Sequence, residues 1–188
     1  MKEYTYSKDK RIYVFDDVFS FAERSFMYDF ALNSKFKFER GAYPFPEAGS
    51  NVFQLMSGFN ETDIVNFGFF ENKAVQNLLE QHGLLRYEIV KARLNACLSS
   101  DVYQVHTDMT DLGFFTLLYF VNLDWKPEWE GETIFTESDA REIFCSVAFV
   151  PGRIVLFNSN IPHKSSQPST KAPYHRFVFN CVVKRHGN

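Results

Sequence analysis

Two histidines and one aspartate in this sequence have the residue types and the spacing of a metal site. His106 and Asp108 are separated by a single threonine, and His163 follows in a distant segment. Two imidazoles and one carboxylate can hold ferrous iron on one face and leave the opposite face open for other ligands. These three residues therefore predict an iron centre with room for reactants.

The spacing of His106 and Asp108 suits an extended chain. A strand directs residues i and i+2 to the same face, so we expect a strand over residues 102–108 that presents both side chains to one ion. An inward-facing carboxylate beside a histidine is costly unless a positive charge neutralises it, and a divalent metal does so. The alternative for His106 is a strand histidine that hydrogen-bonds locally.

The third ligand must come from the other histidines of the five in the chain. His82 ends a polar helix, and His186 lies in the basic C-terminal tail. His175 directly precedes Arg176 on an expected strand, so the two side chains point to opposite faces. His163 follows an expected strand and its turn, and it is the favoured third ligand.

Arg176 is the expected anion-binding residue. It lies at the start of a run of apolar residues that we expect to form a strand buried on both faces. A buried guanidinium needs an anionic partner, and a dicarboxylate cosubstrate supplies one through a bidentate pair. The alternative is a surface arginine on an edge strand.

Helical patterns are confined to the first part of the chain. A helix is expected over residues 18–32 and a second over residues 72–82, with Gly83 as its natural stop. Residues 41–50 are rich in Gly and Pro and predict a loop. In the first helix the apolar residues recur at helical spacing, namely Phe19, Ala22, Phe26 and Phe30.

The second part of the chain alternates short β-branched and aromatic runs with turn residues, which predicts strands. The fold class is therefore mainly β with supporting α: a double-stranded β-helix, or jelly roll, with N-terminal helices packed on one sheet. We expect one domain over residues 1–188, in which 1–83 form helical support and the first strands and 84–188 form the jelly-roll core. The expected strands are 11–15, 86–98, 102–108, 114–122, 132–136, 145–150, 153–158 and 174–184.

The composition limits the classes of binding partner and the cellular compartment that we expect. The chain has 188 residues, a net charge of −3 and a pI near 6.0, so it has no electrostatic footprint for nucleic acid or an anionic membrane. No apolar run has the length of a signal peptide core or a membrane span. Cys97, Cys145 and Cys181 form no disulfide framework and predict reduced thiols in a cytoplasmic protein. The oligomeric state stays open.

Several motifs occur in an order that resembles the Fe(II)/2-oxoglutarate-dependent dioxygenases, in particular their prolyl-4-hydroxylase-like branch. The resemblance covers residues 93 to 183, and the motifs together are far more specific than any one of them. They are Asn95, HTD at 106–108, TLLYFVNLDW at 116–125, WEGETIF at 129–135, PGRIVLFNSNIPH at 151–163 and HRFVF at 175–179.

The resemblance implies a role for each motif residue. The three candidate ligands above become iron ligands, and Arg176 pairs with the distal carboxylate of 2-oxoglutarate. Thr133 offers a hydroxyl to the same carboxylate, with an ordinary strand threonine as the alternative. Asn95 lines the pocket, or else satisfies backbone groups. The implied cofactors are Fe(II), 2-oxoglutarate and O2, and ascorbate is a further candidate.

The activity implied is hydroxylation of an unactivated C–H bond, with succinate and CO2 as the other products. The retained Asp108 separates this chain from related halogenases, which have a small residue there. A prolyl residue in a peptide or protein is the expected substrate, and a free amino acid or other small metabolite is the alternative. A non-catalytic jelly-roll binding module and a cupin-type metal enzyme without 2-oxoglutarate are rival interpretations.

Some residues depart from the family pattern or have two interpretations. Phe120 replaces a tyrosine that contacts the cosubstrate in several relatives, which removes one hydrogen bond and weakens the case for a prolyl substrate. Trp125, Trp129 and Tyr119 are candidates for substrate contact, although core packing is the favoured interpretation of each. Residues 41–60 are a candidate lid over the site.

Overall fold

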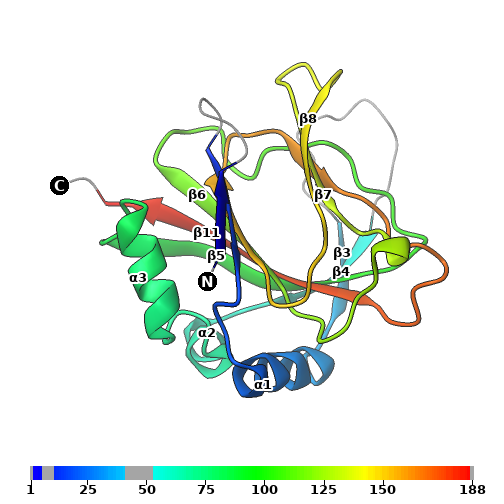
Figure 1. Cartoon of the computed structure of the whole chain (residues 1–188), viewed down its shortest axis with the longest axis horizontal. Helices are drawn as coiled ribbons and strands as arrows, with labels where there is room; N and C mark the ends of the chain where they lie inside the picture. The colour runs from blue at the N-terminus through cyan, green and yellow to red at the C-terminus, as the bar shows by residue number, and fades with distance from the viewer. Residues whose placement is uncertain (1, 6–10, 41–52, 187–188) are drawn as a thin grey trace.

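The computed structural model describes residues 2–5, 11–40 and 53–186, and it shows two antiparallel sheets facing each other (Figure 1). The larger sheet has the strand order β1-β2-β9-β6-β11-β5-β4-β3, and the smaller has the order β10-β7-β8. Helices α1, α2 and α3 lie on the face of the larger sheet that is turned away from β7 and β8. This confirms the jelly roll with helices packed on one sheet.

The strands of the larger sheet come from the whole length of the chain, and residues before 83 supply four of them as well as the three helices. They are β1 (Lys2–Thr5), β2 (Ile12–Asp16), β3 (Lys37–Arg40), β4 (Phe53–Gly58), β5 (Tyr87–Cys97), β6 (Phe114–Phe120), β9 (Ile154–Asn158) and β11 (Arg176–Arg185). The smaller sheet contains β7 (Thr133–Thr136), β8 (Ile143–Val147) and β10 (His163–Ser165), and a 3-10 turn η1 (Pro127–Trp129) precedes it.

Each central strand serves two cores, because alternate side chains point to opposite faces of the sheet. On β6, Leu117 and Tyr119 enter the cluster between the sheet and the helices. Leu118 and Phe120 enter the cluster between the two sheets. The first eight residues of β11 are buried in succession, as expected for a strand covered on both faces. The jelly roll is thus filled on both sides of its largest sheet.

The three helices are defined by their caps. Helix α1 (Phe21–Leu32) begins after Ser20, whose hydroxyl accepts from the Glu23 backbone N–H while the Glu23 carboxylate accepts from the Ser20 N–H. This capping box places the start later than the expected residue 18. Helices α2 (Glu61–Phe67) and α3 (Lys73–Gln81) begin after Asn60 and Asn72, and α3 ends before Gly83 as expected.

The expected apolar stripe of the first helix is confirmed only in part, since Phe30 packs against the core but Ala22 and Phe26 do not. Phe19 lies before α1 and packs in the core, whereas Ala22 is exposed and Phe26 is 57% exposed. The buried residues of α1 are Met27 and Ala31. The most buried face of α1 therefore lies one residue on from Phe26 and Phe30, about 100° around the helix.

Three expectations about the segments near the site need correction. Residues 102–108 form no regular strand, and their single β-bridge joins His106 to His163. Strand β10, which starts at His163, was not predicted. Of the candidate lid 41–60, residues 41–52 lie outside the described residues, and β4 is a strand of the larger sheet paired with β3 and β5.

Two of the compositional expectations can be compared with the structure. Cys97, Cys145 and Cys181 are all free thiols and all buried, so the prediction of reduced thiols is confirmed. Within the described ranges, no helix has the length and apolar character needed to cross a bilayer.

Candidate metal centre

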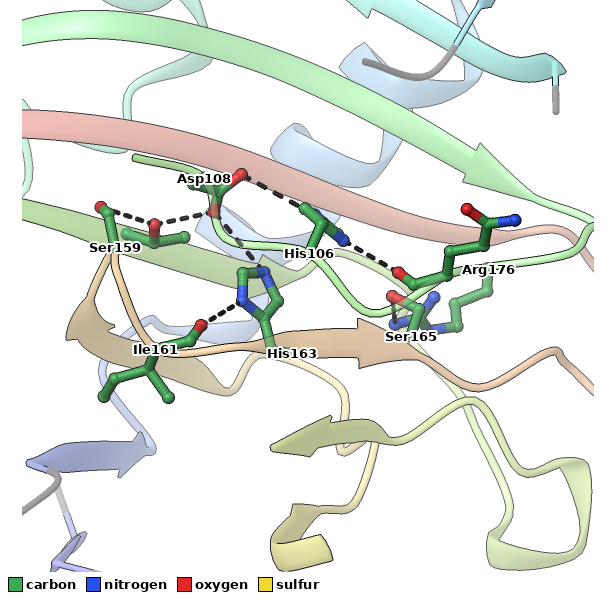
Figure 2. A network of polar contacts seen from close by, with 9 residues as sticks. His106, Asp108, Ser159, Ile161, His163, Ser165 and Arg176 are labelled. Atoms are coloured by element: carbon green, nitrogen blue, oxygen red, sulfur yellow. Dashed lines mark hydrogen bonds and ion pairs between the residues drawn. The ribbon is translucent and has the colours of Figure 1, made fainter. Parts of the chain in front are cut away.

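The three predicted ligands converge on one point between the two sheets (Figure 2). His106 Nε2 lies 4.0 Å from Asp108 Oδ1, and His163 Nε2 lies 3.6 Å from Asp108 Oδ2. One ligand atom from each residue lies within 4.8 Å of the others. A first-row divalent ion with bonds of about 2 Å fits between atoms at this spacing after a small inward movement of the side chains.

Backbone carbonyls orient both imidazoles. Nδ1 of His106 lies 3.0 Å from the Gln104 carbonyl oxygen, and Nδ1 of His163 lies 2.9 Å from the Ile161 carbonyl oxygen. A carbonyl oxygen only accepts, so Nδ1 carries the proton in each ring and donates it. Nε2 of both histidines therefore presents a lone pair to the centre, as a metal ligand must.

Asp108 is held by residues that the sequence did not single out. Its Oδ2 accepts a 2.8 Å hydrogen bond from Thr116 on β6, and the Thr116 hydroxyl lies 2.9 Å from the Ser159 hydroxyl. The Asp108 backbone N–H also donates to the Ser159 carbonyl. The one available signal was a threonine within the otherwise apolar run of β6. These hydrogen bonds hold the carboxylate in one orientation, as the partners of metal ligands commonly do.

The irregular segment at residues 102–108 presents two candidate ligands because a β-bridge fixes its position. The His106 and His163 backbones exchange two 2.9 Å hydrogen bonds across their β-bridge. Their rings lie 4.6 Å apart. Thus the bridge places the two histidines side by side without a full strand at residues 102–108, and Asp108 reaches the same side two residues later.

The metal-free centre favours a neutral His106 and an ionised Asp108. Burial, with a further effect from His163, lowers the pKa of His106 to about 4. The pKa of Asp108 is also lowered: burial by itself opposes this, but the two histidines and the Thr116 hydrogen bond outweigh it. A neutral imidazole beside a carboxylate is the protonation state in which both groups can bind a cation.

The lowered pKa of His106 predicts a pH-dependent loss of stability in the metal-free protein. Unfolded His106 takes up a proton near pH 6.5, whereas the folded residue does so only near pH 4. The contribution of the neutral His106 to the free energy of unfolding is therefore complete above pH 6.5 and is lost as the pH falls toward 4. At pH 5 the free energy of unfolding should already be lower by about 2 kcal/mol. Denaturant unfolding of chelator-treated protein at pH 7 and pH 5 measures this difference.

The substitution His106→Asn isolates this effect, because it removes the titrating ring from the same position. The variant should lose about 2 kcal/mol less than the parent between pH 7 and pH 5. His175→Asn is the matched control, since His175 is exposed on the opposite face from Arg176. Equal pH dependence in the parent and the His106 variant would contradict the prediction.

Arg176 is completely buried and has no carboxylate partner among the described residues. Its Nη1 lies 3.2 Å from Cys97 Sγ, and its Nη2 donates to Ser165 Oγ at 3.2 Å. The guanidinium also lies 5.1 Å from the centre of the Phe149 ring. These are weak partners for a buried cation, and its Nε has none at all. The site thus fits an anion that arrives with a ligand.

Thr133 and Asn95 are placed near this guanidinium and the pocket, respectively. Thr133 pairs in register with Ser165, and its buried hydroxyl has no hydrogen-bond partner. Asn95 lines the pocket that contains the three candidate ligands, and its buried Oδ1 is also without a partner. Buried polar atoms are rarely left unsatisfied, so both atoms fit an absent polar ligand.

The pocket is a cavity of about 110 Å³ that extends from the candidate ligands to Cys97 and Ser165. Arg176 lies behind these last two residues, and its two terminal nitrogens point toward them. A carboxylate that enters the pocket would replace the contacts to the thiol and the hydroxyl with a charge-assisted pair. The cavity is therefore suited to a short anionic ligand that lies between the metal position and Arg176.

Gly131 leaves room for the Arg176 side chain. It has a φ of +91°, and a Cβ atom added to it would lie 2.8 Å from Cδ of Arg176. Gly131→Ala should therefore lower the free energy of unfolding by about 1–3 kcal/mol, from backbone strain and the clash. Urea denaturation measures this loss.

Gly58→Ala is the control for Gly131→Ala, because a Cβ at Gly58 meets no atom within 4 Å and its φ is not positive. The Gly131 variant should also displace the guanidinium and weaken anion binding at Arg176. Equal losses of stability in both variants would contradict the role assigned to Gly131.

The aromatic candidates for substrate contact are core residues. Tyr119 is fully buried between the sheet and the helices, and Trp125 and Trp129 are each 8% exposed within the core between the sheets. Phe120 stacks on Phe149 at 4.5 Å, and Phe149 in turn contacts Arg176. The packing interpretation therefore holds for all three candidates, and Phe120 supports Arg176 through an aromatic contact.

Comparisons with known proteins agree with this geometry. The family model described as "2OG-Fe(II) oxygenase superfamily" matches residues 92–184, which contain all six predicted site residues. A search of curated proteins found no match.

Many solved structures share the fold at low sequence identity. An oxidoreductase of the 2OG-Fe(II) oxygenase family from Burkholderia pseudomallei has a TM-score of 0.68 and 11% identity, and the match covers 93% of this chain and 86% of that one. A prolyl hydroxylase from Trichoplax adhaerens, bound to a peptide of hypoxia inducible factor, has a TM-score of 0.64 and 14% identity, with 93% and 82% covered. HygX from Streptomyces hygroscopicus, with nickel and 2-oxoglutarate bound, has a TM-score of 0.64 and 10% identity, with 93% and 82% covered.

The matching model spans every motif, and the chain keeps a histidine, an aspartate and a second histidine that converge in a jelly roll. Residues 92–184 therefore match the 2OG-Fe(II) oxygenase superfamily, enzymes whose reaction requires Fe(II), 2-oxoglutarate and O2.

Proposed function

We propose that this enzyme hydroxylates an unactivated C–H bond at an iron centre held by His106, Asp108 and His163. The observation that carries the proposal is the convergence of two Nε2 lone pairs and one carboxylate at a single point of the pocket. This ligand set leaves one face of the ion open. A non-catalytic binding module would have no need to keep all three ligands.

The residues at the far end of the pocket are proposed to hold 2-oxoglutarate. Arg176 would pair with the distal carboxylate, and the unpartnered Thr133 hydroxyl would donate a hydrogen bond to it. Ser165, which already contacts Arg176, would keep the guanidinium oriented. An enzyme that used the metal without 2-oxoglutarate would leave the Arg176 charge buried and unpaired, which is unfavourable.

The positions of these residues indicate separate roles for the metal ion and for the protein side chains. Bound Fe(II) supplies the chemistry, which couples decarboxylation of 2-oxoglutarate by O2 to oxidation of the substrate. The protein side chains hold the ion, orient the cosubstrate and exclude water from the reacting atoms. No side chain has to act as nucleophile or general base.

Two substrate classes remain candidates for this site. A prolyl residue in a peptide is suggested by the similarity to the Trichoplax prolyl hydroxylase, which was solved with a peptide. A free amino acid or other small metabolite is favoured by the small volume and the positive charge of the pocket. The identity to that prolyl hydroxylase is only 14%. We therefore favour the small metabolite, which the size and charge of the pocket suggest.

The function is tested with purified protein, Fe(II) and 2-oxoglutarate. We expect O2 consumption and succinate release, both abolished by a chelator. Mass spectrometry of a host-cell extract treated in the same way should reveal a product that has gained one oxygen atom. If 2-oxoglutarate fails to raise the melting temperature of the Mn(II)-loaded protein, the proposal is wrong, because a ligand that binds the folded state must stabilise it.

Two subsidiary proposals accompany this function. Ascorbate would serve as a reductant that keeps the iron ferrous, and its omission should shorten the period of linear turnover. A cytoplasmic location is proposed because all three cysteines are free thiols, as is usual in a reducing compartment.

A further inference from the structure

One wall of the pocket carries two cationic side chains that the proposed reaction does not use. Lys91 and Arg93 lie on β5 and line the same pocket as the candidate metal ligands. They share a face of the strand with Asn95 and Cys97, because these positions are two residues apart. The intervening residues of β5 point to the helix side, where Ala92 and Leu94 are buried.

The charge of this wall is positive once the metal centre is set aside. The described ionisable residues that line the pocket, apart from the proposed ligands, are Lys91, Arg93, Cys97 and Tyr103. Burial raises the pKa of Tyr103, so it is neutral at pH 7. Burial and then the neighbouring Arg93 charge lower the pKa of Lys91, and the carboxylates of Asp108 and Glu39 act more weakly in the opposite direction. Two cations that disfavour each other in this way are stabilised by an anion between them.

Register places these cations at the metal end of the pocket. Asn180 on β11 lies opposite both Arg93 and Leu118, and the Arg93 charge contributes to the lowered pKa of Asp108. Arg176 lies opposite Cys97, four residues further along β5. That interval corresponds to roughly 13 Å of extended chain. An anion at Lys91 and Arg93 is therefore distinct from the carboxylate proposed to bind Arg176.

A buried amide marks the same position as a ligand site. Asn180 is 4% exposed and lines the pocket, and its Oδ1 has no hydrogen-bond partner. The Oδ1 atom of Asn95 on the neighbouring strand is in the same situation. Since a buried amide oxygen left unsatisfied is costly, these two atoms fit a ligand with an N–H or O–H donor.

We propose that the substrate is a small acid, whose carboxylate or phosphate is bound by Lys91 and Arg93 and whose N–H or O–H donor is bound by Asn180. This inference rests on the proposed function, and it favours a small anionic metabolite over a neutral prolyl residue in a peptide. The acidic group would fix the molecule so that a neighbouring C–H bond faces the open side of the metal centre.

The experiment uses the full chain loaded with Mn(II) and 2-oxoglutarate, so that ligands bind without turnover. The probes are matched pairs: N-acetyl amino acids with their amides, and small phosphate monoesters with their alcohols. Calorimetry and melting temperature report binding. We expect at least one acid to bind about tenfold or more tightly than its neutral partner, since a hydrogen bond to a charged group contributes about 1.5–3 kcal/mol. The two probe sets distinguish a carboxylate from a phosphate.

Variants connect that selectivity to the two cations. Lys91→Met and Arg93→Met should each weaken binding of the acid about tenfold and leave binding of its neutral partner unchanged. Lys73→Met is the control, because Lys73 is an exposed residue at the start of α3 and is remote from the pocket lining. Arg93→Lys should retain most of the selectivity for the acid.

Each failure has a separate meaning. If 2-oxoglutarate does not bind the Mn(II)-loaded parent, the proposed function itself fails. If 2-oxoglutarate binds but acids and neutral partners bind equally, or no probe binds, the small-acid substrate is excluded. If Lys91→Met and Arg93→Met weaken 2-oxoglutarate binding and leave acid binding unchanged, the two cations serve the cosubstrate and the inference is overturned.

Discussion

Asp108→Ala should lower the affinity for Mn(II) or Fe(II) by at least about a hundredfold and abolish succinate formation. Asp108 is the only carboxylate of the proposed ligand set, and its side chain is 3% exposed. Without it, two neutral imidazoles remain to hold a dication in a poorly solvated pocket. The loss should exceed that caused by removing a residue that only hydrogen-bonds to a ligand, for which factors of about 10 to 100 are typical. Calorimetric titration of Mn(II) measures the affinity directly.

Two controls make the Asp108 result interpretable. Asp111→Ala removes an exposed carboxylate three residues away and should leave metal affinity unchanged. Thr116→Val removes the hydrogen bond to Asp108 and should have a smaller effect, of about ten- to a hundredfold. Circular dichroism of the metal-free variants checks that the fold is intact. Unchanged metal affinity in a folded Asp108→Ala protein would refute the centre proposed for this chain.

Arg176→Met should weaken 2-oxoglutarate binding by roughly a hundredfold to several thousandfold, while leaving Mn(II) affinity within about a factor of two. The guanidinium is fully buried, and no carboxylate in the described part of the chain pairs with it. Removing it leaves the distal carboxylate of the cosubstrate buried without a partner, which costs about 3–5 kcal/mol when one member of a buried pair is lost. Calorimetry with the Mn(II)-loaded protein measures both affinities.

The same substitution has an opposite expected effect on the cosubstrate-free protein. A buried guanidinium whose partners are a thiol and a hydroxyl is unfavourable, so Arg176→Met should leave stability unchanged or raise it. Arg141→Met is the control, since the Arg141 side chain is 85% exposed. Arg176→Lys should keep the charge but lose the bidentate geometry, and its 2-oxoglutarate affinity should be intermediate. A large loss of stability together with normal 2-oxoglutarate affinity would show that Arg176 serves the fold alone.

Much of the site could be predicted from residue types and order. The single residue between His106 and Asp108 predicts that both side chains point to the same side of extended chain, and in the structure they do. His163, and not His175, lies beside the other two candidate ligands: His175 directly precedes β11 and is exposed, whereas Arg176 at the start of β11 is buried. Both results depend only on the two-residue period of extended chain.

Other features needed long-range contacts that local patterns do not contain. The segment at residues 102–108 looked like a strand, but its ladder is reduced to the His106–His163 bridge. Strand β10 has three residues and exists through its pairing with β7. The buried face of α1 could be predicted only in part, because packing on the sheet, rather than the local apolar pattern, selects Met27 and Ala31 as its buried residues.

By itself, the sequence determined the ligand types, their spacing and the alternating strands of a jelly roll, because side-chain chemistry and the period of extended chain are local properties. Only the tertiary structure decided that Thr116 and Ser159 orient Asp108, that Arg176 is buried without a carboxylate among the described residues, and that Lys91 and Arg93 line the pocket of the candidate ligands. These facts depend on register between strands that are distant in the chain, and register is set by packing of the whole molecule.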